Sequence, residues 1–292
     1  MLSAILGIVL LGTLYPLLTE VFDVRVSVGP PYFNPVGAIF TIPMLLVMAV
    51  GPLLRWRNDS LGRIKMPVLI IAGIMLAVLV AVIVMGAYSV LADLGLAIAV
   101  GLAVGSLLPL RGRKLTRVPI ATWGMVTAHF GIAVALFGMA SETAFNKERL
   151  AAVQAGGTTD VGPWSVTLAG VEPVAGPNWT AIEARLLASY DGGEPIVLGP
   201  QARSFWAPIQ ETNESVLATR WNGQLYAVIG NQGEDGRWQL RLWWKPWVTL
   251  IWYGGLLVAL GGTLALVGRV MEDLKRRRVR TRMAERRREA RA

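Results

Sequence analysis

The chain has 292 residues, of which 54% are hydrophobic and only 16% are charged, against roughly 25% charged residues in ordinary soluble domains. This composition excludes a simple soluble domain and indicates a polytopic membrane protein. The absence of cysteine excludes disulfides, thiolate metal sites and a thiol relay made from this chain. The net charge of +9 gathers at the C-terminus, so we do not interpret it as nucleic-acid binding.

Apolar runs long enough to cross a bilayer, which takes about 20 residues, recur along the chain. They predict six spans, over residues 1–18, 36–54, 67–88, 91–110, 118–140 and 246–267. Because the first run has neither a basic segment before it nor a small-residue cleavage pattern, we expect a membrane helix there and no cleaved signal peptide. Residues 30–35, which include three prolines, predict a stiff turn with interfacial aromatic rings; contact with haem or quinone is the alternative.

The distribution of Lys and Arg predicts the orientation of these spans. Basic residues gather at 55–65, at 111–117 and at 269–292, which six spans place on one side of the membrane. The other side has Arg25 and no Lys or Arg in the turn at 86–93. Since cytoplasmic loops are enriched in Lys and Arg, both termini are predicted to be cytoplasmic. Asp93 is expected to be solvated at the outer mouth of the fourth span, and a proton path is the alternative.

Between the fifth and sixth spans the sequence alternates in polarity and is rich in aromatic residues. Turn signals interrupt it at Asp191-Gly192-Gly193, Asn222-Gly223 and Asp235-Gly236. Short strands joined by such turns predict antiparallel β structure. The predicted fold is therefore a polytopic α-helical membrane protein of about six spans, with a small extracytoplasmic all-β domain inserted before the last span.

This fold divides the chain into five predicted segments. They are a five-span membrane region (1–140), a linker or short helix (141–155), the β domain (156–242), the last span (246–268) and a basic tail (269–292). We expect the tail to lie as an amphipathic segment on anionic lipid headgroups; docking to another subunit is the alternative. Trp243, Trp244, Trp247 and Trp252 predict an aromatic belt at the outer interface, or rings lining a path for a flat hydrophobic ligand.

His129 is the only histidine, and it lies inside the uncharged predicted span at 118–140. At 1.5 Å per residue it is about 16 Å from Val118, near the middle of the bilayer. A titratable ring there is costly and usually has a partner or a function. The two alternatives are a hydrogen bond to a neighbouring helix and ligation of a metal such as haem iron.

Two helical faces of this span are distinguishable. The face that carries His129 also has Thr122, Met125, Ile132, Ala133 and Leu136, at helical spacing. Gly124, Gly131 and Gly138 recur at seven-residue intervals on a second face. Small residues at such intervals allow another helix backbone to approach closely, and they would equally leave room for a porphyrin.

Four segments together resemble the C-terminal half of CcmF, the large membrane subunit of the cytochrome c maturation haem lyase. The first comprises GTLYPL (12–17) and SVGPPYFN (27–34), and the second is AHFG (128–131). The third comprises GPNWTA (176–181), Pro200, Arg203 and QLYAVIG (224–230), and the last is KPWVTLIWYGG (245–255). They keep the family's order along most of the chain.

The resemblance implies a component of a cytochrome c haem lyase that holds a membrane haem b and helps reduce and attach haem to apocytochrome c. In that family haem b lies between two histidines on different helices, and His129 matches the later one as an axial ligand of the haem iron. The family's tryptophan-rich WGGxWxWD-type motif, the histidines flanking it and the earlier axial histidine have no counterpart in this sequence. Catalytic residues therefore stay unassigned, and we expect no lyase activity from this chain alone.

The implied partners are an N-terminal half or other subunits of the haem lyase complex, a haem chaperone and apocytochrome c. Quinol is a further candidate partner, as reductant. The implied location is the bacterial cytoplasmic (inner) membrane, with a periplasmic β domain. The alternative function is a non-catalytic scaffold that binds apocytochrome or maturation partners through the β domain. A transporter ranks third, because the spans contain no paired charges.

Overall fold

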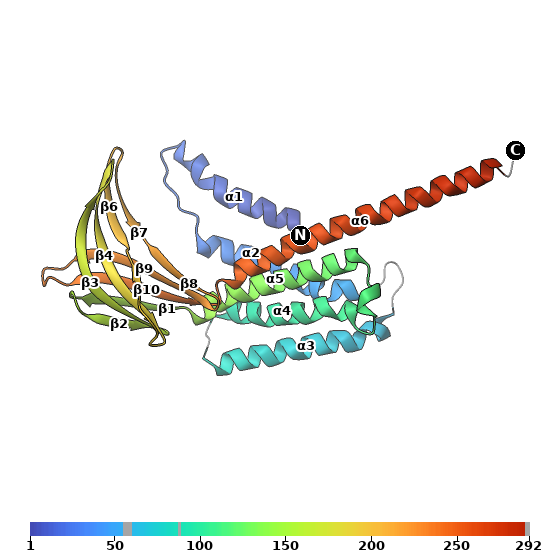
Figure 1. Ribbon diagram of the computed structural model, residues 1–292, viewed down its shortest axis with the longest axis horizontal. Coiled ribbons are helices and arrows are strands. Elements are labelled where there is room, and N and C mark those ends of the chain that lie inside the picture. The colour runs from blue at the N-terminus through green and yellow to red at the C-terminus, as the bar shows by residue number, and fades with distance from the viewer. Residues whose placement is uncertain (55–59, 87–88, 290–292) are drawn as a thin grey trace. The chain divides into compact units, whose positions relative to one another are not determined.

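The computed structural model describes residues 1–54, 60–86 and 89–289 (Figure 1). Among these residues, six helices are long and apolar enough to span a membrane. They are α1 (Leu2–Glu20), α2 (Pro30–Val50), α3 (Leu61–Val84), α4 (Val90–Leu107), α5 (Ile120–Phe145) and α6 (Leu250–Glu289). An all-β domain lies in the sequence between α5 and α6, so the predicted membrane helices and the all-β domain inserted before the last of them are confirmed. The chain forms two compact units, residues 1–136 with 253–292 and residues 137–252.

The basic segment before the third span falls partly outside the described residues, which exclude Arg55 and Arg57. Its remaining cations, Arg63 and Lys65, lie inside α3, because this helix begins at Leu61, six residues before the predicted span. Long basic side chains are tolerated at the end of a membrane helix, since they can extend their charge toward the interface. Tyr88, the predicted end of this span, also lies outside the described residues.

Helix α4 lies at the centre of the membrane unit. In an apolar stretch of 18 residues, 56% of this helix is buried, compared with 22% or less in the other five helices. Small residues allow this close packing: a Cβ added to Gly105 would lie 2.2 Å from the backbone oxygen of Ala49 in α2. The core of the unit joins Leu45 and Ala49 of α2, Ile98 and Leu102 of α4 and Ala133 of α5.

The central position of α4 corrects the expectation for Asp93. This residue lies in the first turn of α4 and is only 5% exposed. Its Oδ1 is buried without a hydrogen-bond partner in the described part of the chain. The prediction of a solvated carboxylate is therefore wrong, because neighbouring residues cover the first turn of this helix as well as its middle.

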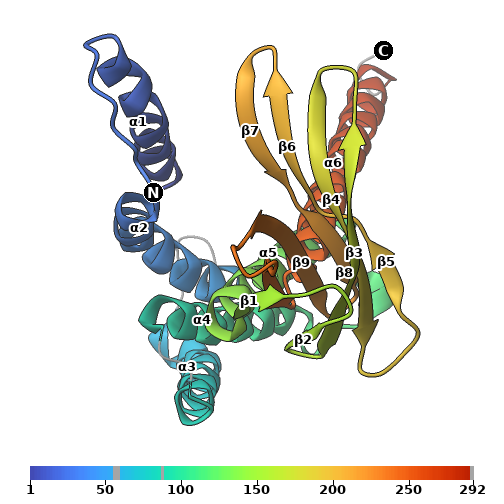
Figure 2. The ribbon, with the colours of Figure 1, turned by 90° about the vertical axis from the view of Figure 1, so that its left-hand side faces the viewer.

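The β domain contains ten strands that pair antiparallel in two sheets (Figures 1 and 2). One sheet has the order β1 (Lys147–Val153), β10 (Trp238–Pro246), β9 (Gly223–Gln232), β8 (Val216–Arg220). The other has the order β2 (Thr158–Val161), β3 (Trp164–Ala175), β4 (Trp179–Tyr190), β6 (Gln201–Trp206), β7 (Ile209–Glu214), with β5 (Ile196–Leu198) paired to β4.

Alternating side chains from both sheets build one core in this domain. In β9, Leu225, Ala227 and Ile229 are at most 1% exposed, while the residues between them are half-buried. Such alternation is what a strand with one face in the core requires. Trp164 of β3 and Leu186 of β4 are buried in the same core. The predicted Asn222-Gly223 turn joins β8 to β9, as its sequence signal indicated.

The boundaries of the β domain differ from the prediction at both ends. Helix α5 continues to Phe145, and Lys147–Val153 forms β1, in the segment predicted as a linker or short helix. Pairing decides this conformation: β1 lies antiparallel to β10 from Lys147↔Trp244 to Val153↔Trp238. The last strand also runs on to Pro246, so α6 begins only at Leu250. The same helix extends to Glu289, through most of the predicted tail.

Candidate functional site

His129 lies in α5, in the middle of the membrane helix that carries it. The residue is half-buried, and its ring nitrogen Nδ1 is buried without a hydrogen-bond partner in the described ranges. A membrane histidine that merely links two helices would be expected to donate or accept such a bond. The hydrogen-bond alternative therefore finds no partner among the described residues.

The side chains beside His129 belong to the core of the membrane unit. Ala133, four residues later on the same helical face, packs with Leu45 of α2 and Leu102 of α4. Ile132 and Leu136 pack against the same cluster. The imidazole thus lies on the same face of α5 as these packed apolar side chains, one turn away. Their packing restricts the access of water to the ring.

The glycine face of α5 packs against α6. A Cβ added to Gly124 would lie 2.3 Å from the backbone nitrogen of Ala265, and one added to Gly261 would lie 2.3 Å from that of Ala128. Because each contact involves backbone of the other helix, the two helices touch without intervening side chains. The prediction of close helix approach is confirmed for Gly124 and Gly131, and this face leaves no room for a porphyrin.

The glycine pattern is reciprocal. Helix α6 carries Gly254, Gly261 and Gly268, again at seven-residue intervals. A Cβ at Gly254 would lie 2.4 Å from the Ala135 nitrogen, and one at Gly268 would lie 2.5 Å from the Ala121 nitrogen. Close packing by small residues is a common way to associate membrane helices. It fixes the rotation of α5 about its axis, and with it the direction of the His129 face.

The residues around His129 do not form a bare-metal site. In residues 1–54, 60–86 and 89–289, no group of three or more His, Cys, Asp or Glu side chains could hold an ion. A haem iron places a smaller demand on the protein, since one histidine suffices as an axial ligand. Among the described residues, His129 could therefore supply one axial ligand to a haem iron, and no cluster of ligands could hold an isolated ion.

An apolar cavity of about 700 Å³ lies between α1 and the segment that leads into α2. Its lining includes Tyr15 of α1 and Tyr32 of α2, from the GTLYPL and SVGPPYFN segments. The rings of Tyr32 and Phe33 meet edge to face and cover Gly12. The predicted stiff turn at 30–35 is in fact the start of α2, because proline suits the first turn of a helix, whose N–H groups have no helical acceptor.

The tryptophans predicted to form one belt separate in the structure. Trp243 and Trp244 are neighbours in β10 and point to opposite faces, as successive strand residues must. Trp244 is 6% exposed in the core, while Trp243 meets Tyr226 edge to face at 5.1 Å on the outer side. The prediction of a single belt is therefore wrong for these two residues. Trp247 instead pairs with Trp221, a residue that no sequence pattern indicated.

A hollow of about 640 Å³ lies over the outer face of the sheet formed by β1, β10, β9 and β8. Tyr226 and Val228 of the QLYAVIG segment line it, together with Trp243. The Arg241 guanidinium lies 4.5 Å from the Trp243 ring centre and pairs with Glu148 at 2.5 Å. Apolar and aromatic side chains thus share this outer face with the polar side chains of Glu148, Gln239 and Arg241.

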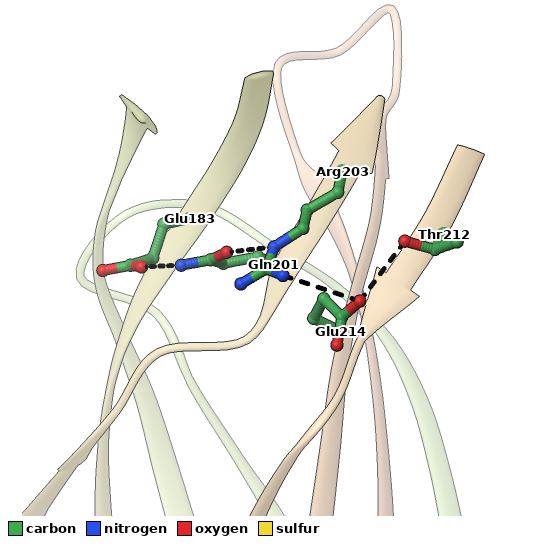
Figure 3. A network of polar contacts seen from close by, with 5 residues as sticks. All are labelled: Glu183, Gln201, Arg203, Thr212 and Glu214. Atoms are coloured by element: carbon green, nitrogen blue, oxygen red, sulfur yellow. Dashed lines mark hydrogen bonds and ion pairs between the residues drawn. The ribbon is translucent and has the colours of Figure 1, made fainter. Parts of the chain in front are cut away.

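Trp179 and Arg203, both from the third segment of the resemblance, meet at a polar network on β4, β6 and β7 (Figure 3). The Arg203 guanidinium lies 4.4 Å from the centre of the Trp179 ring and 3.8 Å from the Glu214 carboxylate. Its Nε donates to Gln201 Oε1 at 2.7 Å, and Gln201 donates in turn to Glu183. Since these side chains satisfy one another, the network holds three strands together, and we assign it a structural role.

Comparison with known proteins shows what these features are similar to. Residues 144–246 match the family model described as the CcmF C-terminal beta-sandwich. The cytochrome c-type biogenesis protein CycK of Bradyrhizobium diazoefficiens is 36% identical over 288 residues, which cover 92% of this chain and 43% of CycK. CcmF of Escherichia coli (strain K12) is 34% identical over 271 residues, which cover 91% of this chain and 42% of CcmF.

A solved structure shows the same similarity. The structure of the cytochrome c heme lyase CcmF matches this chain with a TM-score of 0.70 and 25% sequence identity. The match covers 90% of this chain and 44% of the CcmF chain. This chain thus spans less than half the length of the relatives that it matches. The resemblance inferred from the sequence motifs is confirmed: in sequence and in fold, this chain is similar over about nine-tenths of its length to the C-terminal half of the CcmF family of cytochrome c biogenesis proteins.

Proposed function

We propose that this chain is the part of a cytochrome c haem lyase that holds a membrane haem b. One observation carries the proposal. In a chain similar to the C-terminal half of CcmF, the only histidine lies in the middle of a membrane helix, and its buried Nδ1 has no partner among the described residues. His129 would be one axial ligand of the haem iron. The second ligand would come from an N-terminal half or another subunit.

The residues of this chain would prepare the site in two ways. The glycine contacts between α5 and α6 fix the direction of the imidazole. The packed side chains at Ile132 and Ala133 exclude water from one side of it. Haem b, when bound, would supply one-electron chemistry that helps reduce the haem to be attached to apocytochrome c. The thiols for the attachment belong to apocytochrome c, because this chain has no cysteine.

A quinol is the reductant that we propose for this system. The apolar cavity between α1 and α2 supports this choice, because its volume of about 700 Å³ lies within the roughly 300–1,000 Å³ usual for small-molecule sites. Tyr15 and Tyr32 would provide the polar groups that orient a quinol head in an otherwise apolar lining. A haem chaperone and apocytochrome c complete the proposed set of partners.

We also propose an inner-membrane location with both termini in the cytoplasm and the β domain in the periplasm. The positions of Lys and Arg support this orientation, from Arg111 to Arg117 and in the basic end of α6. That end of α6 would lie near anionic lipid headgroups, which attract basic segments.

The test is the haem content of the assembled complex at equal protein level. His129→Ala should remove most of the low-spin haem b absorbance and impair cytochrome c maturation. Thr127→Ala is the matched control, since it removes a half-buried polar group two residues away on another face of α5, and it should leave the spectrum unchanged. An intact spectrum and haem content in the His129→Ala complex would sink the ligand assignment.

A scaffold function is the second candidate, and the hollow over the outer sheet face of the β domain favours it. Exposed apolar patches rimmed by polar groups often bind other proteins. Under this hypothesis Trp243→Ala would abolish co-purification of a maturation partner, while His129→Ala would change neither the spectrum nor the assembly. The two variants therefore separate the two candidate functions.

A further inference from the structure

Two tryptophans from distant parts of the β-domain sequence meet beside the start of α6. Trp221 follows β8 and begins the turn to β9, and Trp247 lies between β10 and α6. Their ring centres are 5.4 Å apart at an interplanar angle of 71°, an edge-to-face contact. Trp221 is nevertheless 69% exposed, whereas Trp164 and Trp244 are buried in the core of the same domain. We call these residues the Trp221–Trp247 pair.

Hydrogen bonds fasten the turn to the segment that enters α6. The backbone N–H of Trp247 donates to the Asn222 carbonyl at 2.7 Å, and the Thr249 hydroxyl donates to the Trp221 carbonyl at 2.8 Å. Asn222 also donates through its side chain to the hydroxyl of Tyr190 at 2.7 Å. The exposed Trp221 indole therefore projects from a fixed turn.

Trp247 also has an unusual backbone conformation. Its φ of +60° lies in the left-handed region, which a bulky residue rarely adopts. This conformation redirects the chain between β10 and α6 and places the indole against Trp221. Such a conformation costs free energy and persists only where surrounding contacts hold it in place.

The sequence of α6 indicates where the Trp221–Trp247 pair lies relative to the membrane. The helix begins at Leu250, three residues after Trp247, and its first residues are apolar and uncharged through Val267. The backbone N–H of Leu250 donates to the Trp247 carbonyl at 2.9 Å, so Trp247 lies within one turn of the first residue of α6. Trp247, and the Trp221 ring in contact with it, therefore lie close to the level at which α6 enters the hydrocarbon. Trp252, in the first turns of the helix, is 71% exposed.

We propose that Trp221 inserts into the headgroup region of the bilayer, and that the Trp221–Trp247 pair fixes the β domain to the membrane surface through the β8–β9 turn. Indole rings prefer this region, since an apolar body and a polar N–H suit the boundary between hydrocarbon and water. The occupant of the exposed Trp221 face is thus lipid. This inference is independent of haem binding.

The absence of cysteine makes a direct test possible. Trp221→Cys in the full chain creates a single thiol for a nitroxide label, in vesicles of phosphatidylethanolamine and phosphatidylglycerol. Collisions of the label with oxygen, which concentrates in lipid, are compared with collisions with a water-soluble nickel complex. Trp206→Cys is the matched control: Trp206 is 53% exposed near the tip of the β6–β7 hairpin, which lies away from the β8–β9 turn (Figures 1 and 2).

The expected result is an oxygen-to-nickel collision ratio several-fold higher at position 221 than at position 206. Equal ratios would place Trp221 in water and overturn the proposal. Shielding of the label from both reagents would mean that protein covers the turn, and this too would overturn it.

A second measurement tests the proposal without the Trp221→Cys substitution, in case that variant does not fold. In vesicles of brominated lipid, Trp221→Phe should lower the lipid-quenched fraction of tryptophan fluorescence, and Trp206→Phe should not. An unchanged quenched fraction in Trp221→Phe would contradict the insertion of Trp221.

Discussion

Adding one methyl group to α6 should reveal how much the α5–α6 contact matters. In Gly261→Ala, the new Cβ would lie 2.3 Å from the Ala128 nitrogen and 2.6 Å from the Gly124 oxygen. Ordinary contacts of this kind begin near 3.4 Å, and backbone cannot rotate away as a side chain could. The helices must therefore separate by about 1 Å, and overpacking of this kind typically costs about 1–3 kcal/mol.

The neighbouring residue supplies the control. Gly262 has nothing within 4 Å of an added Cβ, so Gly262→Ala gains helix propensity of about 1 kcal/mol without a clash. We expect Gly261→Ala to lower the unfolding temperature of the purified protein in detergent, and Gly262→Ala to leave it unchanged or raise it. Equal unfolding temperatures for the two variants would refute the proposed backbone contact. If His129 ligates haem, Gly261→Ala should also lower the haem content of the complex.

Two further predictions concern topology and the β domain. Reporter fusions should be cytoplasmic after Lys114 and external near Gly192, because Lys and Arg mark the cytoplasmic side; an external signal at Lys114 would contradict six spans. Residues 147–246 expressed alone should show a β-type circular dichroism spectrum, and Arg203→Ala should destabilise them by about 1 kcal/mol, the usual range of a cation–π contact. Arg203→Lys, which keeps the charge but not the planar fork, should recover only part of the loss.

The membrane spans and the β turns were accessible from the sequence because short-range physics determines them. An uncharged apolar run has few alternatives to a membrane helix, and Asn222-Gly223 has the backbone freedom that a tight turn needs. Strand β1 was not accessible in this way. Its Ala-rich sequence has no strong β preference and is largely exposed, so its conformation depends on pairing with β10, a contact distant in sequence.

The tryptophans show the same limit of local patterns. Adjacency in the sequence predicts that Trp243 and Trp244 act together, but the strand places them on opposite faces of one sheet. Trp221 and Trp247 form a pair that depends on two turns meeting in space. For the contact between α5 and α6, by contrast, a signal was present: Gly254, Gly261 and Gly268 repeat the seven-residue interval of the α5 glycines.

The partial burial of His129 agrees with a site that this chain shares with another. The glycine contacts with α6 and the core contacts of Ala133 cover α5 on two faces, yet the histidine remains half-buried. Where two chains each supply one axial histidine, the site in each chain must be open on the side from which the other chain supplies its ligand. The proposed function therefore requires weak haem retention by this chain alone and strong retention in the complex. Equal retention in both would mean that the second ligand is not external, and the division of the site between two halves would be wrong.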